Sequence, residues 1–147
     1  MNRRSFLGTS TALLGGGMLA ACATGPRLSE MASRIPAVPQ DKGRIWFLRS
    51  SSPVGMAMQP AIMLNGRKVG ESIPGGAFWQ DVVPGNYEVS TATEIDNRLT
   101  FTVTAGEERF VRTYVAPGLM VGRVVPELVD STEGRDALAS KSLTASI

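Results

Sequence analysis

The chain has 147 residues, the length of a single domain, and its formal net charge is only +2. Arg3 and Arg4 stand at the N-terminus, and basic and acidic side chains balance in the rest of the sequence. This composition argues against a nucleic-acid-binding protein, which needs a basic face. With no histidine and one cysteine, we also expect no metal site, no cofactor, no Ser-His-Asp or Cys-His catalysis and no intramolecular disulfide.

The first 21 residues have the build of a secretory signal peptide: a basic start, a weakly apolar stretch and small residues before Cys22. The alternative is a buried N-terminal helix, in which the three glycines at positions 15–17 would each cost up to ~1 kcal/mol relative to alanine. A membrane span would need roughly 20 strongly apolar residues. We therefore predict a signal peptide over residues 1–21.

The last residues of this leader, Leu19, Ala20 and Ala21, together with Cys22, resemble the lipobox of bacterial lipoproteins. In those proteins the leader is cut before the cysteine, the thiol receives a diacylglycerol group, and the new amino terminus is acylated, for example with palmitate. The resemblance implies that Cys22 is the lipidation site and that the protein is held at a membrane. Several acyl chains make a stable anchor, because each buried CH₂ contributes ~0.8 kcal/mol. The alternative is a free cysteine placed here by coincidence.

The start of the leader, NRRSFLG, resembles the twin-arginine export signal at Arg3, Arg4, Phe6 and Leu7, but departs from it at the first and last positions. The resemblance implies export of the folded chain, whereas the alternative is an ordinary Sec leader with two arginines. Cys22 is followed by alanine rather than aspartate. By resemblance to Gram-negative lipoproteins, this implies a location at the outer membrane, facing the periplasm.

Residues 22–43 contain three prolines and no sustained hydrophobic period, which is typical of a flexible tether after the lipidated cysteine. A coil of this length spans about 25 Å root-mean-square, enough to hold a domain clear of lipid headgroups. Two alternatives stay open: a short helix over residues 28–33, and packing of part of the segment on the domain.

Strand patterns recur over residues 44–130 and are broken by turn residues. The first, RIWFLR from Arg44, is apolar on both faces, as expected for a central strand. The Asn65-Gly66 pair predicts a hairpin with a type I′ turn, since both turn positions need positive φ. Pairing across it would set Leu64 opposite Arg67 and Ile62 opposite Val69.

A second hairpin is predicted at Pro84-Gly85, where proline presets φ and glycine supplies a positive φ. The segment from Leu99 to Thr104 alternates apolar residues with threonine, which indicates a strand with one wet face. Pro126 lies late in the last strand pattern and favours an edge strand or a strand end. The tail, residues 131–147, is compatible with a short helix or with a frayed end.

About seven or eight short strands in some hundred residues predict an all-β fold, an antiparallel β-sandwich with Ig-like or transthyretin-like topology. The runs LNGRKVG, IPGGAFWQDVVPGNYEVS and LTFTVTAGEERFVR resemble the DUF2846-type lipoprotein domain over most of residues 43–129. More loosely, they resemble carboxypeptidase-regulatory-like sandwiches. The resemblance implies a sandwich fold and, because that domain has no established activity, assigns no residue a role.

The sequence singles out no catalytic pair. The carboxylates around the middle strands show no spacing that pairs two of them for acid–base chemistry, and we expect them to be solvated: Asp81, Glu88, Glu94, Asp96, Glu107 and Glu108. Trp79 and Phe78 are adjacent and alternate in direction, so one of them faces outward and offers an aromatic surface for a ligand. The alternative is that both are core.

We therefore expect a lipid-anchored cell-envelope protein, and not an enzyme, whose β-sandwich is a structural or protein-interaction module with an envelope protein as partner. A module that binds glycan or peptidoglycan fragments near Trp79 is the first alternative. A hydrolase with two converging carboxylates is the second.

Overall fold

The computed structural model describes residues 22–93, 95–120 and 122–147. The predicted leader lies outside these described residues. This applies to all of its candidate residues: Arg3, Arg4, Phe6, Leu7, Leu19, Ala20 and Ala21.

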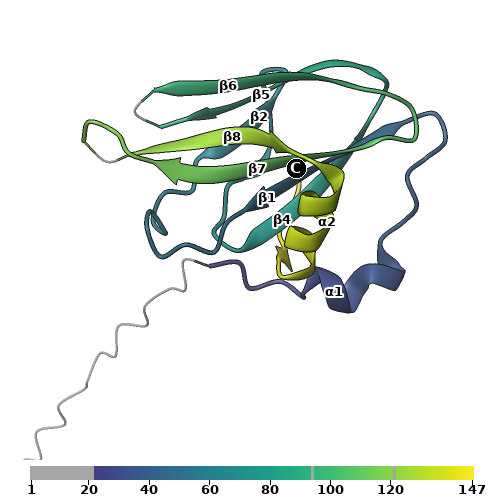
Figure 1. Ribbon diagram of the computed structural model, residues 1–147, viewed down its shortest axis with the longest axis horizontal. Coiled ribbons are helices and arrows are strands. Elements are labelled where there is room, and N and C mark those ends of the chain that lie inside the picture. Colours follow the sequence, from purple (N-terminus) through teal and green to yellow (C-terminus); the bar gives the residue numbers. More distant parts are fainter. Residues whose placement is uncertain (1–21, 94, 121) are drawn as a thin grey trace, which may run out of the picture.

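Two sheets face each other to form a sandwich (Figure 1). The first has the strand order β8-β7-β1-β4-β9, and the second has the order β3-β2-β5-β6. Neighbouring strands are antiparallel except for the β1–β7 and β4–β9 pairs, which are parallel. The predicted all-β sandwich is confirmed, and its strands are β1 (Gly43–Arg49), β2 (Ala61–Leu64), β3 (Arg67–Glu71), β4 (Gly76–Val82), β5 (Gly85–Ala92), β6 (Asp96–Val103), β7 (Glu108–Ala116), β8 (Arg123–Val129) and β9 (Ser142–Leu143).

Strand β1 lies in the middle of the first sheet, and this explains its apolar pattern on both faces. Ile45 and Phe47 point into the core between the sheets. Trp46 and Leu48 point to the opposite face, which is covered by the helices α1 (Leu28–Met31) and α2 (Ser131–Ala139). The central-strand prediction is therefore confirmed, and the fold has a second, smaller core outside the sandwich.

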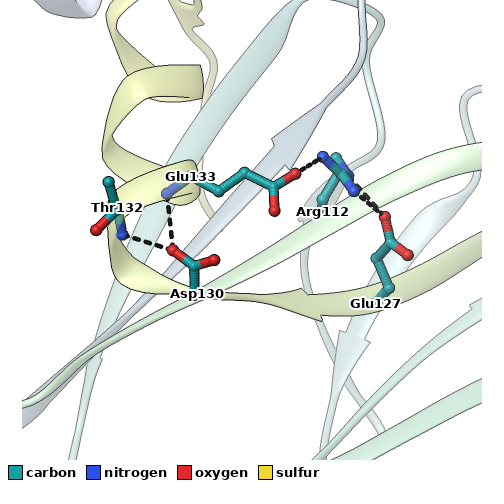
Figure 2. A network of polar contacts seen from close by, with 5 residues as sticks. All are labelled: Arg112, Glu127, Asp130, Thr132 and Glu133. Carbon is teal, nitrogen blue, oxygen red and sulfur yellow. Dashed lines mark hydrogen bonds and ion pairs between the residues drawn. The ribbon is translucent and has the colours of Figure 1, made fainter.

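Helix α2 is capped and fastened by a network of polar contacts (Figure 2). The Asp130 carboxylate accepts hydrogen bonds from the backbone N–H groups of Thr132 and Glu133, both at 2.9 Å, which satisfies two amides that have no partner inside the helix. Glu133 in turn forms an ion pair with Arg112 of β7, which also pairs with Glu127 of β8. The tail is therefore an ordered part of the domain, not a frayed end.

Residues 22–43 were expected to form a flexible tether, but the first half of this segment packs on the domain. Helix α1 and the 3₁₀ turn η1 (Ala32–Arg34) lie against the domain, and Leu28 is only 3% exposed. Arg27 forms a β-bridge with Ser142, and the Leu28 N–H donates to the Lys141 carbonyl at 2.9 Å. One buried leucine and backbone pairing with the C-terminal segment hold this stretch on the outer face of the first sheet.

The first predicted hairpin is confirmed, with one change of register. Asn65 and Gly66 have φ values of 48° and 79°, and Leu64 pairs with Arg67. Ile62, however, pairs with Gly70 and not with Val69, because a bulge interrupts the ladder between Ile62 and Met63.

The second predicted hairpin is wrong. Strands β4 and β5 belong to different sheets, so residues 83–84 connect the two layers of the sandwich. Strand β4 pairs with β1 along Ala77–Val82 and with β9 at Gly76 and Ala77, whereas β5 pairs with β2 and β6 in the other sheet. Gly85 accordingly has no positive φ.

Two further predictions are confirmed. Pro126 lies on β8, an edge strand of the first sheet. In β6 the side chains of Thr100 and Thr102 are exposed while Val103 is buried, so this strand has the expected solvent-exposed face.

Candidate functional site

Cys22 lies at one end of the sandwich, which we call the anchor end and define as Cys22 together with loops 50–60, 72–75, 93–95 and 117–122. Strands β1, β3, β5 and β7 run toward this end, and β2, β4, β6, β8 and β9 start from it. In Figure 1 these loops and the start of the coloured chain lie on the left of the molecule.

The Cys22 side chain is exposed, but the chain joins the domain at the very next residue. The Ala23 N–H donates to the Pro74 carbonyl at 3.1 Å, beside the first residue of β4. Two shallow clefts of about 400 Å³ and 250 Å³ meet at Cys22 and Ala23, one toward Leu143 and the other toward Ser51 and Met56. Any group attached to the Cys22 sulfur would therefore emerge directly at the surface of the domain.

A buried arginine braces the largest loop of the anchor end. The Arg49 guanidinium donates to the carbonyls of Gly55 and Met58, at 3.1 and 3.0 Å, and to both the carbonyl and the hydroxyl of Ser72. The Ser72 hydroxyl is also hydrogen-bonded to that of Thr113 at 2.8 Å. Burial lowers the pKa of Arg49 from its ordinary value. Arg49 thereby fixes loops 50–60 and 72–75 to the end of the sheet.

The two aromatic candidates for ligand binding lie on opposite faces of β4, as their adjacency predicts. Phe78 is 2% exposed and stacks on Phe47 between the sheets, with ring centroids 4.9 Å apart. Trp79 is half-buried on the outer face, 5.1 Å from the Trp46 ring. Phe78 is therefore a core residue, and Trp79 is packed into the second core with only part of its ring in solvent.

Sequence reasoning did not single out the arginine beside these rings. The Arg44 guanidinium lies 5.2 Å from the centroid of Trp79 and 5.8 Å from that of Trp46. It is bound by both carboxylate oxygens of Asp81 and donates to the Pro36 carbonyl at 2.8 Å. The sequence did contain a sign of this site: the apolar central strand has an arginine near each end, Arg44 and Arg49. A charge buried at such a position needs a hydrogen-bonding or ionic partner.

The carboxylates considered for acid–base chemistry are held by arginines wherever the structure describes them; Glu94 lies outside that part. Besides Asp81 with Arg44, the ion pairs are Glu88 with Arg98 at 2.7 Å, Asp96 with Arg98 at 3.9 Å, Glu107 with Arg109 at 2.9 Å, and Glu108 with Arg135 at 3.2 Å. Glu108 also accepts a 2.7 Å hydrogen bond from the Trp46 indole. The described carboxylates therefore form ion pairs with arginines, and Glu108 also holds the Trp46 indole.

The two arginines of β7, Arg109 and Arg112, are both ion-paired. They lie on opposite faces of β7, which is an inner strand of its sheet. Arg112 bridges β8 and α2, as Figure 2 shows. Partial burial lowers the pKa of Arg112, but the bonds to Glu127 and Glu133 outweigh it and raise that pKa.

An open groove of about 420 Å³ runs over the solvent-exposed face of the second sheet, between Asn65 and Thr102. Tyr87 and Phe101 contribute to its lining, but both rings pack against the core between the sheets. Its polar groups bond to one another: the Thr102 hydroxyl donates to Asn86 at 2.7 Å, and the Asn65 side-chain oxygen accepts from the Glu88 N–H at 2.8 Å.

Within residues 22–93, 95–120 and 122–147 no group of three or more histidine, cysteine, aspartate or glutamate side chains is placed to hold a metal ion. Over the same residues, neither helix has the length and apolarity to cross a bilayer.

These features define a two-layer β-sandwich protein with a helix-covered outer face and an exposed cysteine where the described fold begins. The chain belongs to the DUF2846 family, described as a protein of unknown function, whose model matches residues 39–124. An uncharacterized protein of Haemophilus influenzae is 27% identical over 134 residues, which cover 88% of this chain and 79% of the relative. No solved structure shows a significant match.

Proposed function

We propose that this protein is a bacterial lipoprotein, anchored through acyl groups on Cys22, whose β-sandwich is an interaction module of the cell envelope. The observation that carries the proposal is the position of Cys22. It is exposed, it follows a leader-like sequence with a lipobox-like end, and the Ala23 N–H directly after it is bonded to the Pro74 carbonyl of the domain. Cleavage before Cys22 would therefore leave this attachment of the chain to the domain in place.

The leader adds the export route and the destination to this proposal. Arg3, Arg4, Phe6 and Leu7 support export through the twin-arginine route, and the alanine after Cys22 supports the outer membrane. The protein would then face the periplasm, with an envelope protein as its partner.

An interaction module fits the carboxylates better than a hydrolase does. A carboxylate pair for hydrolysis needs one group that donates a proton and one that stays ionised, in a shared cleft. The described candidates are instead occupied by arginines, as Asp81 is by Arg44. We therefore propose binding and not catalysis.

Replacing Cys22 tests the anchor. In a Gram-negative host, the full-length Cys22→Ser chain should accumulate as an uncut precursor that takes up no labelled palmitate, whereas the wild type should be shortened and acylated. Mass spectrometry of the N-terminal peptide and separation of inner from outer membranes provide the readout. Normal processing and membrane retention of Cys22→Ser would contradict the proposal.

A matched control tests whether acylation requires the thiol at position 22 or only a thiol somewhere in this part of the chain. In Cys22→Ser/Ser29→Cys a thiol is restored on the exposed face of α1, seven residues downstream. This variant should remain uncut and unacylated, since the processing enzymes read the residues before the cysteine. Replacing Arg3 and Arg4 with lysine tests the route in the same host: export should stop if the guanidinium pair is read, and continue through Sec otherwise.

A ligand-binding module is the second candidate, and one observation favours it: the open groove over the solvent-exposed face of the second sheet, lined by the polar side chains of Asn65, Asn86, Thr100 and Thr102. Amide and hydroxyl groups of this kind can hydrogen-bond the hydroxyl groups of a sugar. Titration with peptidoglycan fragments, followed by chemical shifts of the residues that line the groove, tests it, with Trp79 on the other sheet as the reference position.

A further inference from the structure

The anchor end differs from the rest of the surface in both charge and polarity. Loops 50–60, 72–75 and 117–122 contain no aspartate, glutamate, lysine or arginine. The opposite end carries charges in each of its longer connections, including Asp41, Lys42 and Glu107. Among the loops of the anchor end only 93–95 contains a charged residue, Glu94, so the loops of this end carry little charge.

Large apolar side chains gather at the anchor end. Seven such side chains are exposed in the described part of the chain, and four of them belong to the anchor end: Val54, Ile95, Leu119 and Met120. Leu119 and Met120, at the tip of the β7–β8 loop, are 94% and 88% exposed. Two adjacent, almost fully exposed large apolar residues in a loop without charges are the kind of surface that marks an interaction site.

The loops that carry these side chains are held in place. Arg49 binds the carbonyls of Gly55, the residue after Val54, and of Met58 in the same loop. The Thr93 hydroxyl accepts from the Val124 N–H at 3.4 Å, and the Arg123 side chain donates to the Pro117 carbonyl at 3.2 Å. These bonds join loops 93–95 and 117–122 to the start of β8. The apolar end is thus a preformed surface.

The position of Cys22 decides what would lie against this surface. Because Ala23 is already bonded to Pro74, no tether separates Cys22 from the domain. Acyl groups on Cys22 would hold the anchor end directly at the lipid headgroups. Strands β4, next to Cys22, and β7, which carries the Leu119 loop, flank β1 and are therefore about 10 Å apart, so one flat surface reaches both.

We propose that the anchor end is a membrane-docking face, and that Leu119, Met120 and Val54 enter the headgroup region of the same phospholipid bilayer that holds the acyl groups of Cys22. Arg27 and Arg123 lie at its rim and favour anionic lipids, with the acidic Asp96 at the start of β6 as an opposing charge. This inference rests on the proposed function, because the acyl anchor supplies the membrane.

A fluorophore placed on the loop tests the docking. Full-length Leu119→Cys is matured in the host, where Cys22 is consumed by acylation, and the new thiol is labelled with an environment-sensitive dye. The acylated protein is then reconstituted in vesicles of phosphatidylethanolamine and phosphatidylglycerol. The dye should shift to shorter emission wavelengths and be quenched by doxyl-labelled lipids. Ala105→Cys, exposed in the β6–β7 turn at the opposite end, is the matched control and should show neither effect.

The remaining outcomes distinguish this inference from the anchor. If the acylated protein floats with the vesicles but the dye at position 119 stays aqueous, the docking face is wrong and the anchor stands. If position 119 is shielded only in native membranes, an envelope protein covers this end and the docking inference is overturned. If the wild type carries no acyl groups and does not float, both proposals fail.

Discussion

Arg44 and Asp81 are register partners on β1 and β4, and their side chains meet in a two-contact ion pair on the outer face of the first sheet. Nε to Oδ1 is 2.7 Å, and Nη2 to Oδ2 is 2.9 Å. Arg44 is only 2% exposed and lies against the rings of Trp46 and Trp79. One carboxylate therefore balances a guanidinium that would otherwise be a buried, unpaired charge.

Asp81→Asn should lower the free energy of unfolding by about 3 kcal/mol, because removing one partner leaves the other charge buried. Circular dichroism during thermal unfolding provides the measurement. Asp41→Asn, at an exposed aspartate, is the control and should change the stability by less than about 0.5 kcal/mol. The double variant Arg44→Met/Asp81→Leu should recover most of the loss; equal stability of Asp81→Asn and the wild type would contradict this role of the pair.

Leu28→Ala should destabilise the domain by about 2–5 kcal/mol, since it empties a buried site between α1 and the first sheet. Ser29→Ala, at the exposed neighbouring position, should have little effect. Chemical denaturation of both variants compares them directly. If residues 22–43 acted as a free tether, the two variants would unfold at the same denaturant concentration.

Gly66→Ala should cost about 1–2 kcal/mol, because Gly66 has a φ of 79° in the turn between β2 and β3. Gly85→Ala is the matched control. Gly85 has no positive φ, and an added Cβ would meet only the Tyr87 ring, at 4.0 Å. A drop in the unfolding midpoint for Gly66→Ala alone is the expected result, and equal drops would show that the two turns are alike.

Glu107 should stabilise the domain at neutral pH and lose this effect in acid. Partial burial raises the pKa of Glu107, but hydrogen bonds from the Thr104 N–H and hydroxyl, together with Arg109, outweigh it and hold the pKa below the ordinary value of 4.5. The folded state thus binds the proton less readily than the unfolded state. Stability is full above pH 4.5 and falls as the pH decreases toward the lowered folded-state pKa.

Glu107→Gln should therefore unfold at a lower temperature than the wild type at pH 7, and the difference should shrink as the pH falls below 4.5. Thermal unfolding across this range measures it. Glu30→Gln, on the exposed side of α1, is the control and should follow the wild type at every pH. A difference between Glu107→Gln and the wild type that is independent of pH would rule out the ionised carboxylate as the cause.

Local patterns in the sequence determined the strands and their faces. The Asn65-Gly66 pair and the alternation from Leu99 to Thr104 depend on neighbours within a few residues, and the structure has both as expected. The apolar run of β1 likewise indicated a strand covered on both faces. The adjacency of Phe78 and Trp79 determined that they point in opposite directions.

Tertiary pairing decided which sheet each strand joins and what covers each face. Pro84-Gly85 has the composition of a hairpin turn, but β5 pairs with β2 and β6, so the chain crosses to the other sheet after β4. Residues 23–35 have the composition of a linker, but the fold brings the C-terminal segment alongside, and its carbonyls and the site for Leu28 hold this stretch. The group of exposed apolar side chains at the anchor end arises in the same way. Val54, Leu119 and Cys22 are far apart in sequence, and only the common direction of the strands places them at one end, because hydrogen-bond partners and buried contacts between distant segments leave no local signal in the chain.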